Sequence, residues 1–248
     1  MDGLTNFEND LSVAVIGASG AIGHALVAAL IAQPQVAQIY MLSRTAQTAP
    51  AEHCHVLPID LTQENTIQQA ANSIKQHTPL DIVLVATGIL HNDADLMPEK
   101  SLRDLSAEKF QQVFAINTIG PALIAKHFLP IMHKQRKAVF AVLSARVGSI
   151  SDNHLGGWYA YRASKAGLNM ILKTAAIEIA RTNKQVIVAG LHPGTVDSRL
   201  SQPFQANVPS EKLFTPQFAA EQLLQVIIDL HPQDTGKVFA WDGQVIPY

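Results

Sequence analysis

The sequence predicts a doubly wound α/β fold, in which helices cover both faces of a parallel sheet of about seven strands. Short apolar runs, typical of buried strands, alternate along the chain with longer segments whose apolar residues recur at helical spacing. The 248 residues are 48% hydrophobic and 15% charged, which suits a globular chain with a sizeable core. Because no repeat, low-complexity tract or linker interrupts the pattern, we expect one domain over residues 1–248.

The expected strands are short and apolar, and several end at a glycine or a polar turn. They lie at residues 12–16, 36–43, 55–59, 80–86, 138–143, 185–191 and 238–241. The expected helices are rich in helix-forming residues or carry one apolar face, and Ser106 is a good N-cap for the longest of them. They lie at residues 25–32, 62–77, 106 to about 133, 158–181 and 216–230. The least regular stretch is 198–212.

Charge and cysteine content limit the classes of partner. The formal net charge is −2, so the chain lacks the basic footprint of a nucleic-acid-binding protein. The one cysteine, Cys54, excludes an internal disulfide framework, and its neighbours His53 and His55 lack the further ligands of a metal site. The first ten residues lack a secretory pattern, and no long apolar segment suggests a membrane span. We therefore expect a cytoplasmic enzyme with no metal.

Tyr161 and Lys165 form a Tyr-x-x-x-Lys pair inside the expected helix 158–181. Residues four apart on a helix share a face, so the phenol and the ammonium should stand side by side. A nearby cation lowers the pKa of a tyrosine from its usual value of about 10, which would let the phenol exchange protons near neutral pH. Such pairs are also common on solvated helix faces, so this one indicates chemistry only if a cofactor site accompanies it.

A glycine-rich turn between the first strand and the first helix predicts a dinucleotide site of the Rossmann type. Gly17 permits the tight turn, Gly20 lets the backbone approach a pyrophosphate, and Gly23 lets the helix pack closely. The free N–H groups at the helix N-terminus suit the phosphates. Close packing of small residues is the alternative explanation of the turn. The residues expected to contact the cofactor here are Gly17, Ser19, Gly20, Ala21 and Ile22.

Together these motifs resemble the short-chain dehydrogenase/reductase family, and within it the compact single-domain branch that holds carbonyl reductases and C-factor-like proteins. The resemblance extends from about Ser12 almost to the C-terminus. It rests on motifs that occur in the family's order: the glycine turn, Asp60-Leu61, Asn117-Thr118-Ile119-Gly120, Ser144 with Gly148-Ser149, Tyr161 with Lys165, and Pro193-Gly194.

The resemblance implies how the catalytic residues act. Tyr161 would be the general acid that protonates the carbonyl oxygen, and Lys165 would lower the tyrosine pKa and hold the nicotinamide ribose. Asn117 would hold a water in the proton relay to the lysine. The sequence itself adds a reason for a special backbone at this asparagine, because Pro121, four residues later, lacks the N–H that would bond to the Asn117 carbonyl. The helix should bend there.

The serine position departs from the family's pattern. The family usually places its catalytic serine three residues before a glycine, and counting back from Gly148 gives Ala145. Successive strand residues point to opposite faces, so Ser144 can serve only if the strand end is twisted or shifted. We expect Ser144 to be the catalytic serine, and without such a hydroxyl the protein would be a slow reductase relying on Tyr161 alone. Two lesser departures are Ala21 in the glycine turn and Ala86-Thr87-Gly88 in place of Asn-Ala-Gly.

The end of the second strand predicts the choice of cofactor. An acidic side chain there would favour NAD, whereas Ser43-Arg44 brings a cation that can grip a 2′-phosphate. We therefore expect NADP(H) in preference to NAD(H), the alternative being that Arg44 is an ordinary surface arginine. The resemblance makes Asp60 a contact to the adenine edge; Asp60 could also cap the helix before Thr62, and the two roles are compatible. The resemblance adds further cofactor contacts at Asp60, Leu61, Ala86, Thr87, Gly88, Tyr161, Lys165, Pro193, Gly194 and Val196.

The leading hypothesis is an NADPH-dependent reductase that transfers hydride to the carbonyl of a small ketone, aldehyde or quinone. The alternative is a weakly or non-catalytic dinucleotide-binding signalling protein of the C-factor-like kind, which the alanine at position 145 favours. The resemblance makes 198–212 a substrate lid. It also implies a homodimer or homotetramer, although some carbonyl reductases are monomers, and we expect neither nucleic-acid nor membrane partners.

Overall fold

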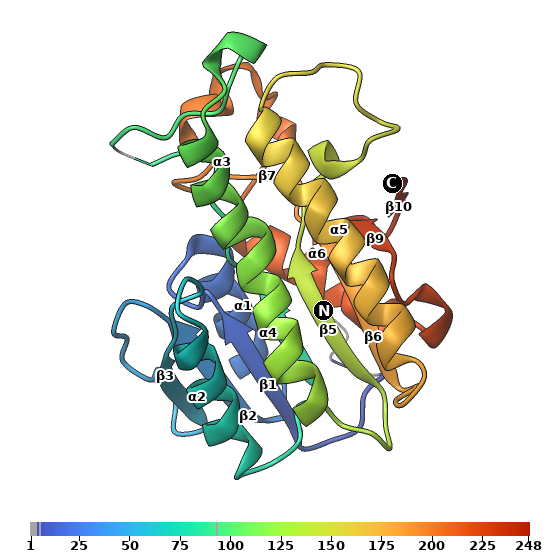
Figure 1. Cartoon of the computed structure of the whole chain (residues 1–248). Helices are drawn as coiled ribbons and strands as arrows, with labels where there is room; N and C mark the ends of the chain where they lie inside the picture. Colours follow the sequence, from blue (N-terminus) through green and yellow to red (C-terminus); the bar gives the residue numbers. More distant parts are fainter. Residues whose placement is uncertain (1–3, 5, 93) are drawn as a thin grey trace.

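An eight-stranded sheet runs through the computed structural model, which describes residues 4, 6–92 and 94–248 (Figure 1). Its strand order is β10-β9-β6-β5-β4-β1-β2-β3, and the strands pair in parallel except for β10 with β9. The strands are β1 Leu11–Ile16, β2 Val36–Ser43, β3 Cys54–Pro58, β4 Ile82–Val85, β5 Ala138–Leu143, β6 Val186–His192, β9 Val238–Ala240 and β10 Val245–Ile246.

The described residues place one strand more in this sheet than the seven expected. The added strand, β10, has two residues and returns antiparallel to β9, so it is too short to carry a recognisable alternating pattern. β4 is shorter than the apolar run 80–86, because Leu80 forms an isolated bridge with Met132 instead. The doubly wound α/β class is confirmed.

Helices cover both faces of the sheet (Figure 1). α1 (Ala21–Ile31) and α6 (Pro216–Asp229) pack on one face, in an apolar cluster that includes Val13 and Val15 of β1. α2 (Glu64–Lys75), α4 (Gly120–Phe128) and α5 (Tyr159–Ile179) pack on the other, in a cluster that includes Ala14 and Ile16. The alternation of β1 residues between the two clusters is what a strand buried on both faces requires.

The strand order reverses beside β1, whose neighbours are β2 and β4. In open parallel sheets, ligands bind beyond the carboxyl ends of the strands at such a switch point. The glycine turn follows β1, residues 86–88 follow β4, and α5 begins beyond β5. The topology therefore gathers the sequence motifs at one edge of the sheet.

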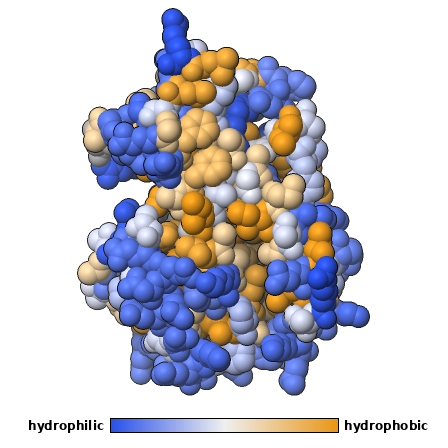
Figure 2. All heavy atoms as spheres, viewed as in Figure 1, coloured by the Kyte–Doolittle hydropathy of each residue, from blue (hydrophilic) through white to orange (hydrophobic). Residues whose placement is uncertain are grey.

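The longest expected helix is helical throughout but changes its type in the middle. α3 (Ala107–Phe114) continues into a π-helical segment, Ala115–Ile119, then into α4 and a 3-10 turn at Leu129–Ile131. By length and composition alone, residues 107–131 could cross a membrane, a test that core helices of other proteins also pass. Here the helix contacts α2 and α5. Figure 2 shows apolar side chains gathered along the middle of this face. Ile119 of the π-helical segment and Met170 and Ile177 of α5 are exposed.

A second, small sheet anchors the expected lid. β7 (Thr195–Val196) pairs in parallel with β8 (Leu213–Phe214), so the residues between them form a closed loop. Two 3-10 turns, Gln202–Asn207 and Ser210–Lys212, give this loop more regular structure than its sequence suggests. Strands of two residues carry no pattern, which is why the sequence did not reveal them.

Candidate active site

Tyr161 and Lys165 lie one turn apart at the N-terminal end of α5, as their spacing predicts. Both are buried, with 9% and 2% of their surface exposed. The Lys165 ammonium lies 5.8 Å from the centre of the Tyr161 ring and donates a hydrogen bond of 2.8 Å to the Leu143 carbonyl at the end of β5. The helix and the strand thus fix the cation beside the phenol.

Burial, and not the cation, dominates the proton affinities of this pair. Desolvation raises the pKa of Tyr161 to about 12 and lowers the pKa of Lys165 to about 8. The net pKa of Tyr161 therefore lies above its usual value and not below it as expected, because the Lys165 charge does not offset the loss of water around the phenol. At neutral pH the phenol carries its proton and the lysine its charge, which is the state that a general acid needs.

Asn117 lies in the π-helical segment, where the sequence predicts an irregular helix. The Gly120 N–H bonds back to the Ala115 carbonyl, five residues earlier, because Pro121 has no N–H to continue the regular ladder. The buried Asn117 amide exchanges two hydrogen bonds of 2.8 Å with the backbone of Ile89, one in each direction. The irregular turn thus ties α3 and α4 to the segment after β4.

Gly88 lies between Asn117 and Lys165. A Cβ at this glycine would be 3.6 Å from the Asn117 Oδ1 and 3.7 Å from the Lys165 Nζ. The Asn117 amide also donates to the Ser164 hydroxyl, 3.1 Å away on α5. The structure therefore brings Tyr161, Lys165, Asn117 and Gly88 together at the carboxyl edge of the sheet.

Ser144 does not join this group. Its hydroxyl donates a hydrogen bond of 2.6 Å to the Asn169 side chain, two turns along α5 from Tyr161. Ala145 is the residue packed in the apolar cluster around Tyr161. The strand end keeps its alternation, so the shift in register that Ser144 would need is not seen. The expectation that Ser144 faces the substrate is corrected to a structural contact between β5 and α5.

The glycine turn has the geometry of a phosphate cradle. Gly17 has φ of 87°, and a Cβ there would lie 2.8 Å from the Thr87 side chain and 2.9 Å from the Ala86 carbonyl oxygen. A Cβ at Gly23 would lie 2.1 Å from the Gly17 carbonyl oxygen, so both positions demand glycine. α1 starts after Gly20 with no side-chain cap, which leaves its first N–H groups available.

Two unpaired polar atoms point to a ligand at the same edge. Among the described residues, four buried side-chain atoms have no hydrogen-bond partner; Thr87 Oγ1 and His192 Nδ1 lie at this edge, and the other two are Gln35 Oε1 and His53 Nε2. They follow β4 and end β6, the strands that lead to Gly88 and to Pro193. Buried polar groups rarely stay unpaired. The cradle and these atoms therefore fit a dinucleotide laid across the carboxyl ends of the strands.

The other expected cofactor residues lie around this edge in different settings. Ser19, Gly20, Ala21 and Arg44 are exposed, whereas Leu61 is buried against α4. The Ser43 hydroxyl donates to the Thr45 carbonyl within its own turn. Asp60 accepts two hydrogen bonds from Thr62 in the turn before α2, but the N-cap of that helix is Gln63, so Asp60 does not cap it. The remaining expected cofactor contacts are half-buried or buried: Ile22, Ala86, Thr87, Pro193, Gly194 and Val196.

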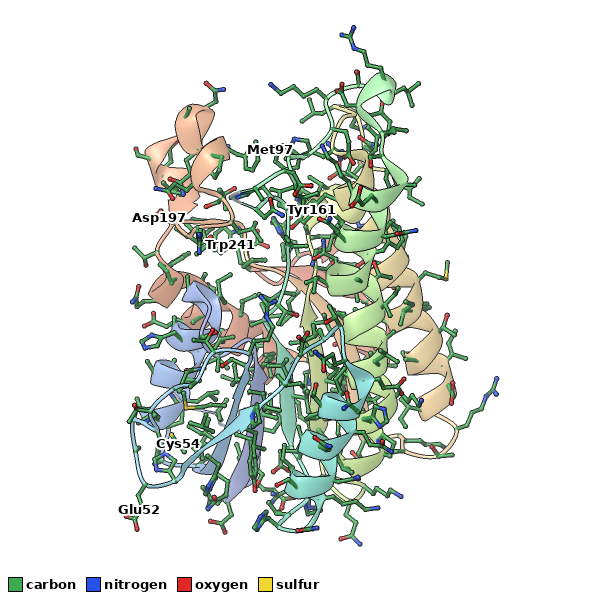
Figure 3. The ribbon with its side chains drawn as sticks, turned by 60° about the vertical axis from the view of Figure 1, so that its left-hand side comes forward. Glu52, Cys54, Met97, Tyr161, Asp197 and Trp241 are labelled. Carbon is green, nitrogen blue, oxygen red and sulfur yellow. The ribbon has the colours of Figure 1, made fainter. Side chains whose placement is uncertain are left out.

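An aromatic wall stands over the tyrosine. Tyr161 clusters with Leu90 and Ala145, and Val147, Trp158, Leu200 and Phe204 pack against them. Figure 3 shows Tyr161 on the side of the molecule where Asp197 and Trp241 lie. Leu200 and Phe204 come from the segment 198–212, so this segment covers the tyrosine as a lid would.

Sequence reasoning missed Glu99, which fixes the start of α5. This buried side chain accepts a hydrogen bond of 3.1 Å from the Ala160 N–H, and its backbone carbonyl accepts one of 2.6 Å from the Trp158 N–H. A carboxylate suits a helix N-terminus. The one local signal was the Gly156-Gly157 pair, which marks a turn but not its distant partner.

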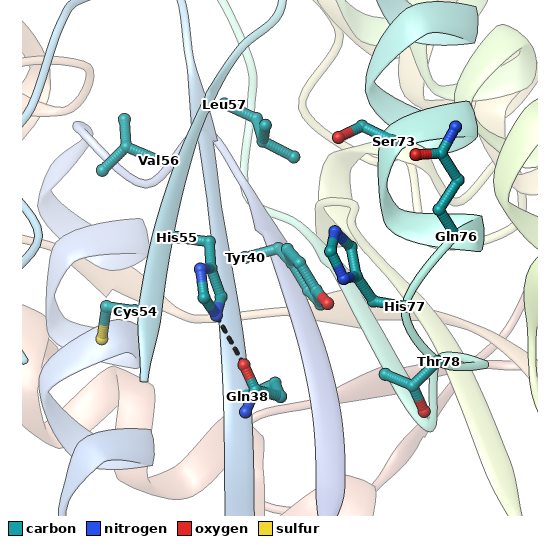
Figure 4. A pocket seen from close by; sticks show the side chains of 10 residues that line it. All are labelled: Gln38, Tyr40, Cys54, His55, Val56, Leu57, Ser73, Gln76, His77 and Thr78. Carbon is teal, nitrogen blue, oxygen red and sulfur yellow. Dashed lines mark hydrogen bonds between the residues drawn. The ribbon is translucent and has the colours of Figure 1, made fainter. Parts of the chain in front are cut away.

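A cavity of about 750 Å³ lies apart from these residues, beside the edge strand β3 (Figure 4). Side chains from β2, β3 and the end of α2 line it, with Tyr40, His55 and His77 prominent among them. His55 and Gln38 form a hydrogen bond of 2.5 Å within it. None of the expected catalytic or cofactor residues lines this cavity, so it lies apart from the candidate active site.

The fold and the site define a nucleotide-dependent oxidoreductase. The family model for short chain dehydrogenases matches residues 12–209, so the protein belongs to this family, whose members bind a nicotinamide dinucleotide. Among curated relatives, the 1-hydroxy-2-glutathionyl-2-methyl-3-butene dehydrogenase of Rhodococcus sp. (strain AD45) is 27% identical over 239 residues, which are 96% of this chain and 99% of the relative. The C-signal protein of Myxococcus xanthus is 29% identical over 148 residues, which are 60% of this chain and 84% of the relative.

Solved structures share the fold closely. The NADPH-bound carbonyl reductase from chicken fatty liver superposes with a TM-score of 0.85 at 22% identity, covering 99% of this chain and 97% of its own. The carbonyl reductase Sniffer of D. melanogaster superposes with a TM-score of 0.84 at 22% identity, covering 97% of this chain and all of its own. At 22% identity, this similarity shows a shared fold and nothing further.

Proposed function

We propose that the protein is an NADPH-dependent reductase that converts a ketone, aldehyde or quinone to the alcohol, with Tyr161 as the general acid. The observation that carries the proposal is the arrangement of Tyr161, Lys165, Asn117 and Gly88 at the carboxyl edge of the sheet, beside a glycine cradle. Membership of the short chain dehydrogenase family supports the reaction class.

The coenzyme, when bound across this edge, supplies the hydride. Tyr161 donates its proton to the carbonyl oxygen as negative charge develops there, and its raised pKa keeps it protonated until then. The Lys165 ammonium, held at the Leu143 carbonyl, stabilises the phenolate that remains. Asn117 holds Ile89 and thereby the loop that carries Gly88, so that the backbone beside Lys165 keeps its place.

A preference for NADPH rests on the end of β2. Arg44 is exposed directly after Ser43, and no carboxylate occupies either position. The pKa of Asp60 is lowered, first by hydrogen bonds from Thr62 and further by the Arg44 guanidinium, which shows that Arg44 and Asp60 share this corner. A guanidinium at this corner suits a 2′-phosphate. The structures of two relatives, one of them the chicken enzyme, contain NADPH or NADP.

The test is NADPH oxidation with a panel of aldehydes, ketones, diketones and quinones, with Tyr161→Phe assayed beside the wild type. Loss of the general acid should reduce kcat by about 100-fold or more while NADPH still binds. Equal turnover in both proteins would contradict the role of Tyr161.

The same assay addresses a signalling role. A weakly catalytic or non-catalytic dinucleotide-binding signalling protein is the less supported alternative; it draws on Ala145, which packs against Tyr161 where the family usually has a serine, and on the likeness of 60% of this chain to the C-signal protein. NADPH binding without turnover of any carbonyl in the panel would support that alternative.

A further inference from the structure

The backbone immediately before α5 has an unusual conformation. Gly156, Gly157 and Trp158 follow one another with φ values of 67°, 65° and 51°. Glycine adopts this left-handed region freely, but a bulky aromatic residue seldom does. Trp158 thus occupies a position whose backbone conformation favours glycine. Residues with such strained backbone conformations often lie at functional sites.

Several hydrogen bonds hold this turn. Glu99 accepts from the N–H groups of Trp158 and Ala160, through its backbone carbonyl and its carboxylate respectively. The Arg162 guanidinium donates to the carbonyls of Gly156 and Gly157, at 3.2 and 3.0 Å. The Trp158 carbonyl accepts from the Arg162 N–H at 2.8 Å. The surrounding structure therefore fixes Trp158 from both sides.

The turn directs the indole against the catalytic tyrosine and the lid. The rings of Trp158 and Tyr161 meet edge to face, with centres 6.2 Å apart. Phe204 of the segment 198–212 lies 5.0 Å from Trp158 and 5.8 Å from His91, measured between ring centres. Leu200 packs in the same cluster, and Tyr161 is only 9% exposed. Phe204 therefore packs against both Trp158 and the cluster that contains Tyr161.

We propose that Trp158 determines the specificity of the site, and that the substrate is a carbonyl compound with a flat apolar group next to the carbonyl. That group stacks on the Trp158 indole in the position that Phe204 now takes, while the carbonyl reaches Tyr161. The proposal rests on the proposed reductase function. Aromatic pairs in contact are favourable beyond the area that they bury, so a phenyl group can replace the Phe204 ring there with little loss.

The test compares two dicarbonyl substrates that differ only in this group, 1-phenyl-1,2-propanedione and 2,3-butanedione. Trp158→Gly removes the indole and suits the left-handed backbone, so this variant should fold. We expect its KM for the phenyl compound to rise by about tenfold or more, as loss of one good aromatic contact implies. Its KM for 2,3-butanedione should change by less than about twofold, and Trp158→Phe should restore most of the discrimination.

Phe204→Ala gives the opposite prediction. Removing the ring that competes with the substrate should lower the KM for the phenyl compound, whereas Trp158→Gly raises it. Leu155→Ala is the matched control, because Leu155 belongs to the same loop but is 92% exposed. If Trp158→Gly changes both substrates equally, or if Phe204→Ala raises the KM for the phenyl compound, the proposal is overturned.

A binding measurement separates this proposal from the proposed function. Saturation-transfer NMR can detect 1-phenyl-1,2-propanedione on the Tyr161→Phe protein with NADPH present, where turnover is not needed. Binding that weakens in the Tyr161→Phe, Trp158→Gly double variant supports the role of Trp158 even if the wild type reduces no carbonyl. Binding that is equal in the two proteins overturns that role even if the wild type is an active reductase.

Discussion

Lys165 should set the alkaline limit of activity. Burial lowers its pKa to about 8 and raises that of Tyr161 to about 12, so the lysine is the first of the pair to lose a proton as the pH rises. The value of kcat/KM for NADPH reports the groups of the free enzyme. One pH unit above a pKa, about a tenth of the groups keep their proton. If only the charged lysine supports the reaction, kcat/KM for NADPH should be about tenfold lower near pH 9 than near pH 7.

Initial rates of NADPH oxidation at a saturating carbonyl concentration, taken from about pH 6 to about pH 10, measure this fall in kcat/KM, which forms the alkaline limb of the pH profile. Lys165→Arg keeps its cation across that range, so whatever activity it retains should show no limb near pH 8. Lys137 is the matched control, because burial also lowers its pKa to about 8. Its ammonium donates to the carbonyls of Ile227 and Ile228 at the end of α6, so Lys137→Met should keep the limb.

Either of two results would refute this role of the Lys165 charge. A wild-type profile that stays flat to about pH 10 would mean that the Lys165 charge is not needed, or that its pKa is not lowered. A limb near pH 8 that persists in Lys165→Arg would assign the titration to another group.

Four further predictions concern stability, cofactor choice and rate. Lys165→Met should raise the free energy of unfolding by up to about 3 kcal/mol near pH 7, because the folded state lowers the lysine pKa from 10.5 to about 8. Urea titrations should show this gain shrinking to about 1 kcal/mol near pH 10. Arg136→Met should lower the free energy of unfolding by about 3–5 kcal/mol in the same titration, because it removes the guanidinium that lies 2.7 and 2.9 Å from the oxygens of the fully buried Asp81. The double variant Arg136→Met, Asp81→Leu should recover much of that free energy. Arg44→Asp should shift the ratio of NADPH to NADH affinity towards NADH by about 10- to 100-fold in direct binding assays, and an unchanged ratio would make Arg44 an ordinary surface residue. Ala145→Ser places a hydroxyl in the cluster around Tyr161 and should raise kcat by about 10-fold or more, because a second donor would then stabilise the developing oxyanion.

The parts of the fold that follow from local chemistry could be predicted from the sequence. The π-helical segment follows from Pro121, whose missing N–H forces the ladder to change at Asn117. Tyr161 and Lys165 lie on the same face of α5 because they are four residues apart on a helix. Gly17 must be glycine because the strand–turn–helix pattern places a tight turn there. In each case the signal lies within a few residues of its effect.

The parts that the sequence could not predict depend on distant contacts. The raised pKa of Tyr161 reflects burial, and Leu200 and Phe204, about forty residues further along the chain, pack in its cluster. Glu99 caps α5 from a loop some sixty residues earlier, and a lone glutamate in a loop has no pattern to reveal this. Alternation along β5 and the family's spacing to Gly148 both argue against Ser144, and the hydrogen bond from Ser144 to Asn169 agrees with them.

Three features that oppose folding meet at this one site. Lys165 is charged although buried, Trp158 is left-handed although not glycine, and the helix through Asn117 departs from the α-helical ladder. The apolar clusters on the two faces of the sheet supply the stability that these features oppose. Each departure instead fixes one group around Tyr161: the ammonium, the indole or the amide. Local rules are broken mainly where function requires it. Lys165→Met should therefore gain stability and lose turnover together, because the buried charge that weakens the fold is the charge that the proposed reaction uses.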